Sequence, residues 1–202
     1  MRTIKTNVYA FNELAEDAKE KAIEKFRDND TEFAWSNEWM DSIKKGLEAF
    51  DAELSDWSID CLCIGRSSYR ISCDEGLEIT GQRLRTYLLN NYYSNFFTCK
   101  PYGQYEKREN GKYRYDRYSN IQYTETCCPF TGFCGDEDFM DVFRGFIKSP
   151  DNDRTLADLL KEAVEKTLYA LQYDCEHQTS DEGITETIEA NEYEFTADGA
   201  EI

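Results

Sequence analysis

Residues 155–177, TLADLLKEAVEKTLYALQYDCEH, form the strongest helical pattern of the chain and decide its fold. Apolar side chains recur there at every third or fourth position, as they do along one face of an α-helix, while the other face is acidic and polar. We therefore predict a long amphipathic helix packed against a core. Its buried stripe comprises Leu156, Leu159, Leu160, Ala163, Val164, Thr167, Leu168 and Leu171.

Five shorter helices are predicted by the same spacing. Residues 12–28 repeat an apolar side chain every four positions from Leu14 to Phe26, and Asn12 is a plausible N-cap. Residues 79–97 and 136–150 form two more, and a short helix follows Ser180. The fifth, at residues 32–54, has an aromatic and aliphatic stripe for core packing, formed by Trp35, Trp39, Ile43, Leu47 and Phe50.

Short segments with alternating polarity predict strands. Residues 4–11 read as one strand, and residues 56–65 (DWSIDCLCIG) and 67–73 (SSYRISC) read as two consecutive strands joined through Gly65. The cysteines of these strands fit as small apolar fillers. The pattern predicts an α+β fold in which a small, mostly antiparallel sheet is covered by helices on one face, in a single domain over residues 1–202.

The dipeptide Asn110-Gly111 predicts a β-hairpin with a two-residue turn, protruding around residues 102–123. This turn would pair Lys107 with Arg114. Cations and tyrosines alternate along the hairpin, a combination that a nucleotide could use for stacking and charge contacts. The candidate ligand-binding residues are Arg108, Tyr113, Arg114, Tyr115 and Arg117.

The 202-residue chain has a formal net charge of −18, and residues 136–202 hold 19 acidic and 5 basic side chains. Such a field repels nucleic acid and anionic membranes and attracts basic protein surfaces, including those that hold nucleic acid. No long apolar run or signal-peptide pattern occurs, so we expect a cytoplasmic protein whose eight cysteines are reduced thiols.

The stretch CCPFTGFCGDEDF, residues 127–139, could hold a metal or form a connector into a helix. Cys127, Cys128 and Cys134, even combined with Cys175 and His177, match no recognised zinc spacing, so we predict no metal and no cofactor. The connector interpretation makes Asp136 a helix cap, followed by Glu137 and Asp138 in the first turn. An Mg²⁺ site of a nuclease, made by these acids and Asp141, is the lesser alternative.

Several segments resemble a family of small, largely uncharacterised bacteriophage and prophage proteins. The resemblance lies in VYAFNELAEDAKEKAIEKFRD (8–28), CCPFTGFCGDEDFMD (127–141) and SDEGITETIEANEYEFTADG (180–199). This chain departs from the family at Ala15, where a serine could cap the first helix, a loss of roughly 1 kcal/mol. The resemblance implies a viral context, and because some members are labelled antitoxins, it also allows an antitoxin role.

Together these features predict a phage accessory protein without enzymatic activity. It would act by stoichiometric binding, inhibiting a host defence or nucleic-acid-processing complex through an acidic surface that mimics DNA. The partner would be a host protein with a basic surface, with no direct contact to nucleic acid or membrane. The candidate contacts are Asp136, Glu137, Asp138, Asp141, Asp158, Glu162 and Glu165.

Overall fold

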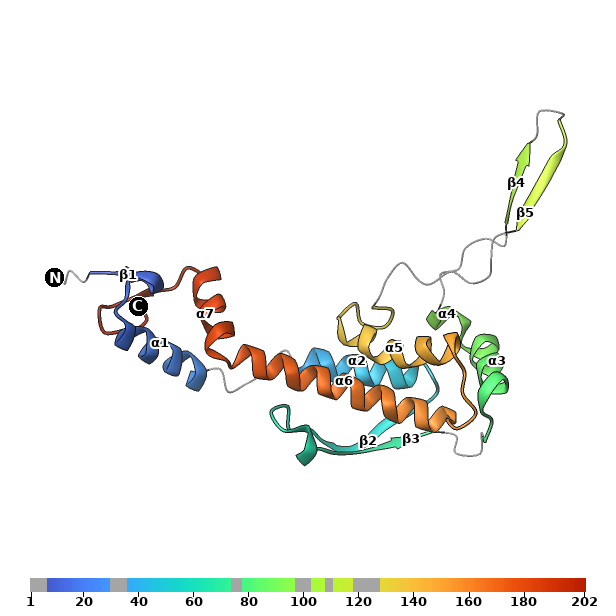
Figure 1. Ribbon diagram of the computed structural model, residues 1–202, viewed down its shortest axis with the longest axis horizontal. Helices are drawn as coiled ribbons and strands as arrows, with labels where there is room; N and C mark the ends of the chain where they lie inside the picture. Colours follow the sequence, from blue (N-terminus) through green and yellow to red (C-terminus); the bar gives the residue numbers. More distant parts are fainter. Residues whose placement is uncertain (1–6, 30–35, 74–77, 97–102, 108–110, 118–127) are drawn as a thin grey trace, which may run out of the picture. The chain divides into compact units, whose positions relative to one another are not determined.

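The protein is described by a computed structural model, which covers residues 7–29, 36–73, 78–96, 103–107, 111–117 and 128–202 (Figure 1). Of residues 103–107 and 113–117 it describes the backbone alone. Helices dominate, and the strands pair antiparallel, so the predicted α+β class is confirmed. In the described part of the chain, the strands form three separate two-stranded pairs instead of one sheet.

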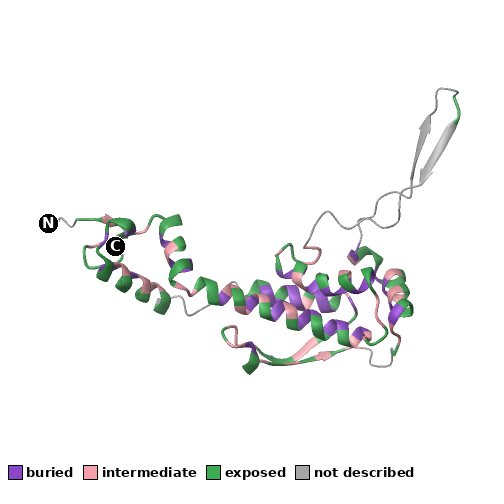
Figure 2. Ribbon diagram, viewed as in Figure 1, coloured by how far each residue is buried: buried purple, intermediate pink, exposed green. Residues whose placement is uncertain are grey.

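The described chain packs into two compact units. Unit 1 comprises residues 1–37, 61–63 and 171–202, and unit 2 comprises residues 38–60 and 64–170. The long helix α6 (Leu156–Gln178) contributes its first part to unit 2 and its last two turns to unit 1. Its predicted stripe from Leu156 to Leu171 is buried, which confirms the amphipathic helix (Figure 2). The prediction of a single domain stays a prediction.

Unit 1 contains β1 (Tyr9–Ala10), the 3₁₀ turn η1 (Phe11–Glu13), α1 (Glu16–Asn29), α7 (Asp181–Ala190) and β6 (Glu194–Phe195). Strand β1 pairs antiparallel with β6, so the two ends of the chain meet in one small core. Ser180 caps α7 by accepting a hydrogen bond from the Gly183 amide, 3.1 Å away. The core consists of Phe11, Leu14, Ala18, Ala22, Ile184, Ile188 and Phe195.

Helix α1 begins later than predicted. Asn12 lies inside η1, so it does not cap the helix. Ala15 takes the capping position, because its carbonyl accepts the first helical hydrogen bonds, from the Ala18 and Lys19 amides. An alanine side chain has no oxygen that could accept hydrogen bonds from the free amides of the first turn. The N-cap of this helix therefore lacks a side-chain acceptor, as predicted from Ala15.

Unit 2 is built around a phenylalanine stack. It includes α2 (Ser36–Glu48, from Glu38 onward), α3 (Gly81–Asn91), α4 (Tyr93–Phe96) and α5 (Gly135–Lys148). The Phe50 and Phe143 rings are stacked at 4.1 Å between centroids, and Phe139 lies 5.9 Å from Phe143. Helices α2 and α5 approach closely at Gly46, where an added Cβ would lie 2.9 Å from the Phe139 ring.

The first pair of strands in unit 2 starts earlier than predicted. Strand β2 (Glu53–Ser58) pairs with β3 (Ser68–Ser72), and the 3₁₀ turn η2 (Ile64–Arg66) lies between them. Cys61 and Cys63 lie in the connection, so the prediction that they belong to a strand is wrong. Strand β2 continues through a register irregularity between Ser55 and Ser58 and ends at Ser58, which pairs with Ser68, so the cysteines lie beyond the strand.

Strands β4 (Gly103–Lys107) and β5 (Tyr113–Arg117) form the predicted antiparallel hairpin with a different register. Lys107 pairs with Tyr113, whereas the expected two-residue turn would pair it with Arg114. Five residues, 108–112, therefore connect the strands, and Gly111 has a φ of +76°. The Asn-Gly signal located the turn correctly, but a longer loop shifts the pairing by one residue.

Candidate functional site

Asp136 is fully buried, which contradicts its predicted role as a partner contact. It lies in the first turn of α5, whose N-cap is Cys134, so Asp136 is not the cap. Its Oδ2 atom accepts the backbone amides of Phe130, Thr131 and Gly132 at 2.8, 2.7 and 3.2 Å. A buried carboxylate held by successive amides cannot contact a partner, and its function is to order the loop that precedes α5.

The loop is also anchored to α2 through hydroxyl groups. Thr131 donates its hydroxyl proton to Asp136 Oδ1 over 2.9 Å. Because that proton is used, the buried Ser42 must be the donor in its 3.0 Å contact with Thr131 Oγ1. The predicted connector into a helix is therefore confirmed, and it is held from inside by one carboxylate.

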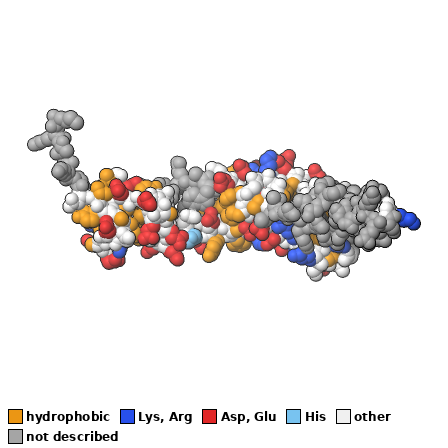
Figure 3. All heavy atoms as spheres, turned by 90° about the horizontal axis from the view of Figure 1, so that it is seen from above, with side chains coloured by type: hydrophobic (Ala, Val, Ile, Leu, Met, Phe, Trp, Pro, Cys, Tyr) orange, Lys and Arg blue, Asp and Glu red, His pale blue; other side chains and the backbone are white. Residues whose placement is uncertain are grey.

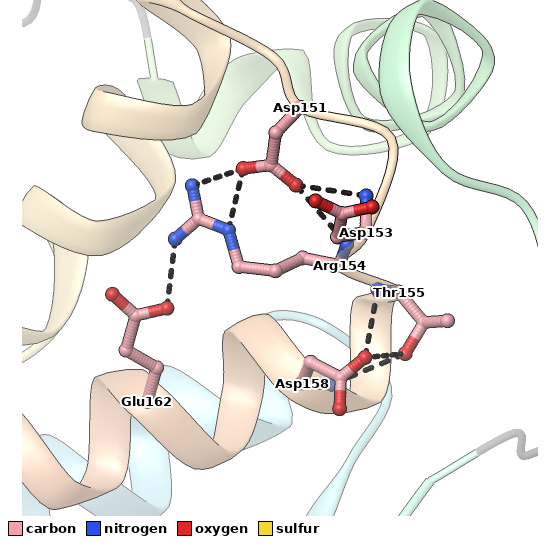
Figure 4. A network of polar contacts seen from close by, with 6 residues as sticks. All are labelled: Asp151, Asp153, Arg154, Thr155, Asp158 and Glu162. Atoms are coloured by element: carbon pink, nitrogen blue, oxygen red, sulfur yellow. Dashed lines mark hydrogen bonds and ion pairs between the residues drawn. The ribbon is translucent and has the colours of Figure 1, made fainter.

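Two other predicted contacts fix the start of α6 (Figure 4). Asp158 and Thr155 form a reciprocal capping box, in which Asp158 Oδ2 accepts the Thr155 amide at 2.9 Å and Thr155 Oγ1 accepts the Asp158 amide at 3.3 Å. The Thr155 hydroxyl, which also donates to Asp158, lowers the pKa of this carboxyl. Glu162 accepts a hydrogen bond from Arg154 at 2.7 Å.

The Arg154 side chain that donates to Glu162 also fixes the connection between α5 and α6. Its guanidinium donates to Asp151 through Nε at 2.7 Å, and its Nη2 lies 2.6 Å from the same carboxylate (Figure 4). Asp151 also accepts the amides of Asp153 and Arg154. The hydrogen bond from Arg154 lowers the pKa of Asp151. These contacts make the acids near 151–162 part of a helix junction.

The remaining predicted contacts lie on α5 and α6. Asp141 accepts a hydrogen bond from Lys166 at 2.9 Å, and Glu165 lies 3.9 Å from Lys161. Glu137 is exposed, whereas partial burial raises the pKa of Asp138. Basic side chains thus accompany Asp141, Glu162 and Glu165, which reduces the net field that this part of the chain offers to a cationic partner.

The sulfur and imidazole groups are separated between the two units. Cys128 and Cys134 belong to the loop of unit 2, while Cys175 and His177 lie on the unit 1 part of α6, and Cys127 lies outside the described residues. Burial, with the neighbouring Cys61 thiol, raises the pKa of Cys175 to about 12. Among the described residues, no group of three or more potential metal ligands comes together.

The candidate nucleotide-binding residues belong to the β4–β5 hairpin. Tyr113, Arg114, Tyr115 and Arg117 lie on β5, and Arg108 lies outside the described residues. The ladder places Tyr105 opposite Tyr115. The nucleotide-binding hypothesis stays a prediction.

The densest negative charge lies in unit 1, on residues not among the predicted contacts. Residues 171–202 contain ten Asp and Glu and no Lys or Arg. The described residues of unit 1 together contain sixteen acidic and four basic side chains, a formal charge of −12. Figure 3 shows acidic side chains among hydrophobic ones on this unit, with few basic ones on the face drawn.

Five exposed glutamates of α7, the following turn and β6 define what we call the unit 1 acidic surface: Glu182, Glu186, Glu189, Glu192 and Glu194. Glu186 lies 3.7 Å from His177. Arg27 donates hydrogen bonds to the Asp181 carboxylate and to the Thr179 carbonyl, and neither of these residues belongs to the unit 1 acidic surface. Counting charge in shorter windows would have identified this surface, because the last 32 residues carry it without a single compensating Lys or Arg.

Comparisons with known proteins add no identification: no family model, curated protein or solved structure matches the chain. In the part of the chain that the structure describes, none of the helices combines the length and the hydropathy needed to cross a bilayer.

Proposed function

We propose that this protein acts by stoichiometric binding of a basic protein surface, with the unit 1 acidic surface as its main contact. The observation that supports the proposal is that residues 171–202 contain ten acidic side chains and no Lys or Arg. Opposite charge speeds association and selects cationic partners, while it repels nucleic acid and anionic lipid.

This proposal moves the contact from the predicted residues on α5 and α6 to unit 1. Arg154 and Lys166 bind Glu162 and Asp141 directly, so these acids already have intramolecular partners. The exposed acids of α7 lie on a helix whose apolar residues Ile184 and Ile188 are buried on the opposite side. A rigid helix holds their charges in place without the entropy cost of ordering a free tail.

The resemblance to phage proteins supplies the context of the proposal. The partner is a component of a host defence or nucleic-acid-processing complex, whose cationic surface ordinarily holds a phosphate backbone. The acidic surface would occupy that place as a mimic of DNA charge, and the protein would inhibit by occupancy without bond-making chemistry.

The proposal is tested by affinity capture from bacterial host lysate, followed by measurement of the affinity for the captured protein at several salt concentrations. The variant Glu182→Gln/Glu186→Gln/Glu189→Gln should weaken binding, and the matched control Glu137→Gln/Glu162→Gln/Glu165→Gln should weaken it much less. Affinity should also fall steeply with salt. Binding that ignores both salt and the α7 substitutions contradicts the proposal, and stabilisation by a nucleotide panel would favour the hairpin alternative instead.

A further inference from the structure

A groove in unit 1 lies between the N-terminal segment 8–13 and the turn that joins α7 to β6. It has a volume of about 630 Å³ and is lined by residues 8–13, 188–189 and 192–194. All these residues belong to unit 1, so the groove is formed within a single packed body. Its volume falls in the range of sites that hold a small ligand or a few side chains of a partner.

Part of the groove lining is apolar. The buried Phe11 and Ile188 line it, together with the partly buried Tyr9 and Tyr193. At its edge Val8 keeps 44% of its surface exposed. An exposed valine beside aromatic rings offers surface from which an apolar side chain would displace water.

The rim of the groove is acidic. Glu13, Glu189, Glu192 and Glu194 are exposed lining residues, and no Lys or Arg is among the residues that line it. The three last belong to the unit 1 acidic surface. A partner side chain that entered the groove would therefore be flanked by carboxylates on more than one side.

Hydrogen bonds hold the Glu13 side chain and the backbone of the turn that carries the rim. The Glu13 carboxylate accepts the Ala10 amide at 3.0 Å, which ties it to the end of β1. Glu192 has a φ of +54°, and its amide and that of Tyr193 donate to the carbonyls of Glu189 and Ile188, both at 3.2 Å. An amide-to-carboxylate hydrogen bond thus holds one side of the groove and backbone hydrogen bonds hold the other, which reduces the ordering cost of binding.

We infer that this groove receives one apolar side chain of a basic partner, from a short segment in which Lys or Arg residues flank a leucine-sized residue. The apolar part of the lining contacts the central side chain, and the glutamates bind the cations. Free phosphate compounds are disfavoured, because four of the lining residues are glutamates and none is Lys or Arg. The inference rests on the proposed function and adds to it the position and the chemistry of the contact.

The test uses the full chain and two fluorescein-labelled peptides, KRLKR and KRSKR, with anisotropy as the readout. The rim variant Glu189→Lys/Glu194→Lys is compared with Glu20→Lys/Glu24→Lys, which makes the same charge change at exposed positions of α1. The rim variant should weaken KRLKR binding by at least about tenfold more than the α1 variant. Val8→Ser should remove the preference of the protein for KRLKR over KRSKR.

Each outcome separates the groove from the general charge of unit 1. If both charge variants weaken binding equally, or if wild-type protein binds the two peptides alike, the groove is not the contact, while the acidic-surface proposal survives. If wild-type protein binds neither peptide at millimolar concentration, the groove inference is overturned. If, in addition, the captured host protein binds independently of salt, the proposed function fails as well.

Discussion

The Thr131 hydroxyl donates to the Asp136 carboxylate over 2.9 Å, across the loop that joins residue 128 to helix α5. Sequence reasoning placed Asp136 at the surface, because an acid just before an apolar helix usually caps it. In the folded chain, the loop turns three consecutive amides toward this carboxylate. The Asp136 carboxylate therefore takes the place of water as the hydrogen-bond acceptor of the loop amides. The conformation of the loop depends on this negative charge.

We expect Asp136→Asn to destabilise the protein by about 2–3 kcal/mol, because hydrogen bonds to a charged acceptor are lost and an amide NH₂ group faces amide donors. Urea unfolding measures the change. Glu137→Gln is the matched control, since it removes one carboxylate from the adjacent, exposed position. Equal midpoints for the two variants would show that the buried carboxylate does not order the loop.

Periodicity predicted most of the helices. The stripe on α6 and the residues Leu84, Leu88, Phe139 and Phe143 are buried as expected. A regular apolar spacing places these side chains on one face of a helix, and that face packs against the core. Strand bounds were less predictable. Strand β2 contains a register irregularity between Ser55 and Ser58, which no alternation of polar and apolar residues marks in the sequence.

The acidic character of the proposed contact surface could be predicted from the sequence, whereas the residues of that surface differ from the predicted contacts. Net charge is additive along a sequence, so the acidity of the C-terminal third could be counted directly. Which of these acids remain available to a partner depends on which of them pair with basic side chains in the folded chain. Arg154 and Glu162 are eight residues apart in sequence and meet because the α5–α6 connection turns Arg154 back along α6. No helical spacing rule predicts that contact.

Gly199 allows the C-terminal turn to pack on α1. Its φ is +84°, and an added Cβ would collide with the Ala18 carbonyl. We expect Gly199→Ala to cost about 2 kcal/mol or more, because backbone strain and a collision with main-chain atoms add together. Thermal or urea unfolding measures the loss of free energy.

Gly132→Ala is the control for this prediction. Gly132 has a φ of +86°, and an added Cβ there meets no heavy atom within 4 Å. It should show the strain alone, about 1 kcal/mol. If the two alanine variants are equally stable, the close packing of Gly199 on Ala18 has no energetic weight.

The pKa of Asp151 should depend on Arg154. The Arg154 hydrogen bond is the largest cause of its lowered pKa, so Arg154→Gln should raise this pKa toward the ordinary value of 3.8. The backbone amides of Asp153 and Arg154 remain and keep part of the shift. Because the pKa is lowered in the folded state, the associated stability is present at neutral pH and is lost as the pH falls through the folded pKa.

Carboxyl resonances followed by NMR during an acid titration measure this change. Arg144→Gln is the control, since Arg144 lies 3.8 Å from Asp141 and belongs to a different ion pair. An Asp151 titration that is the same in wild type and Arg154→Gln would show that the contacts in Figure 4 do not persist in solution.

The buried thiol of Cys175 should make the protein sensitive to alkali. Burial raises its pKa from 9.0 to about 12, so between these values the unfolded chain loses a proton that the folded chain retains. Stability attributable to Cys175 is therefore complete below pH 9 and falls as the pH rises, by at most about 1.4 kcal/mol per pH unit.

Urea unfolding at pH 8 and at pH 10.5 should show a difference between wild type and Cys175→Ala that shrinks at the higher pH, since the alanine has no proton to lose. Cys134→Ala removes an exposed thiol and should follow the wild-type curve. Parallel pH curves for wild type and Cys175→Ala would mean that water reaches this side of α6 in the folded protein.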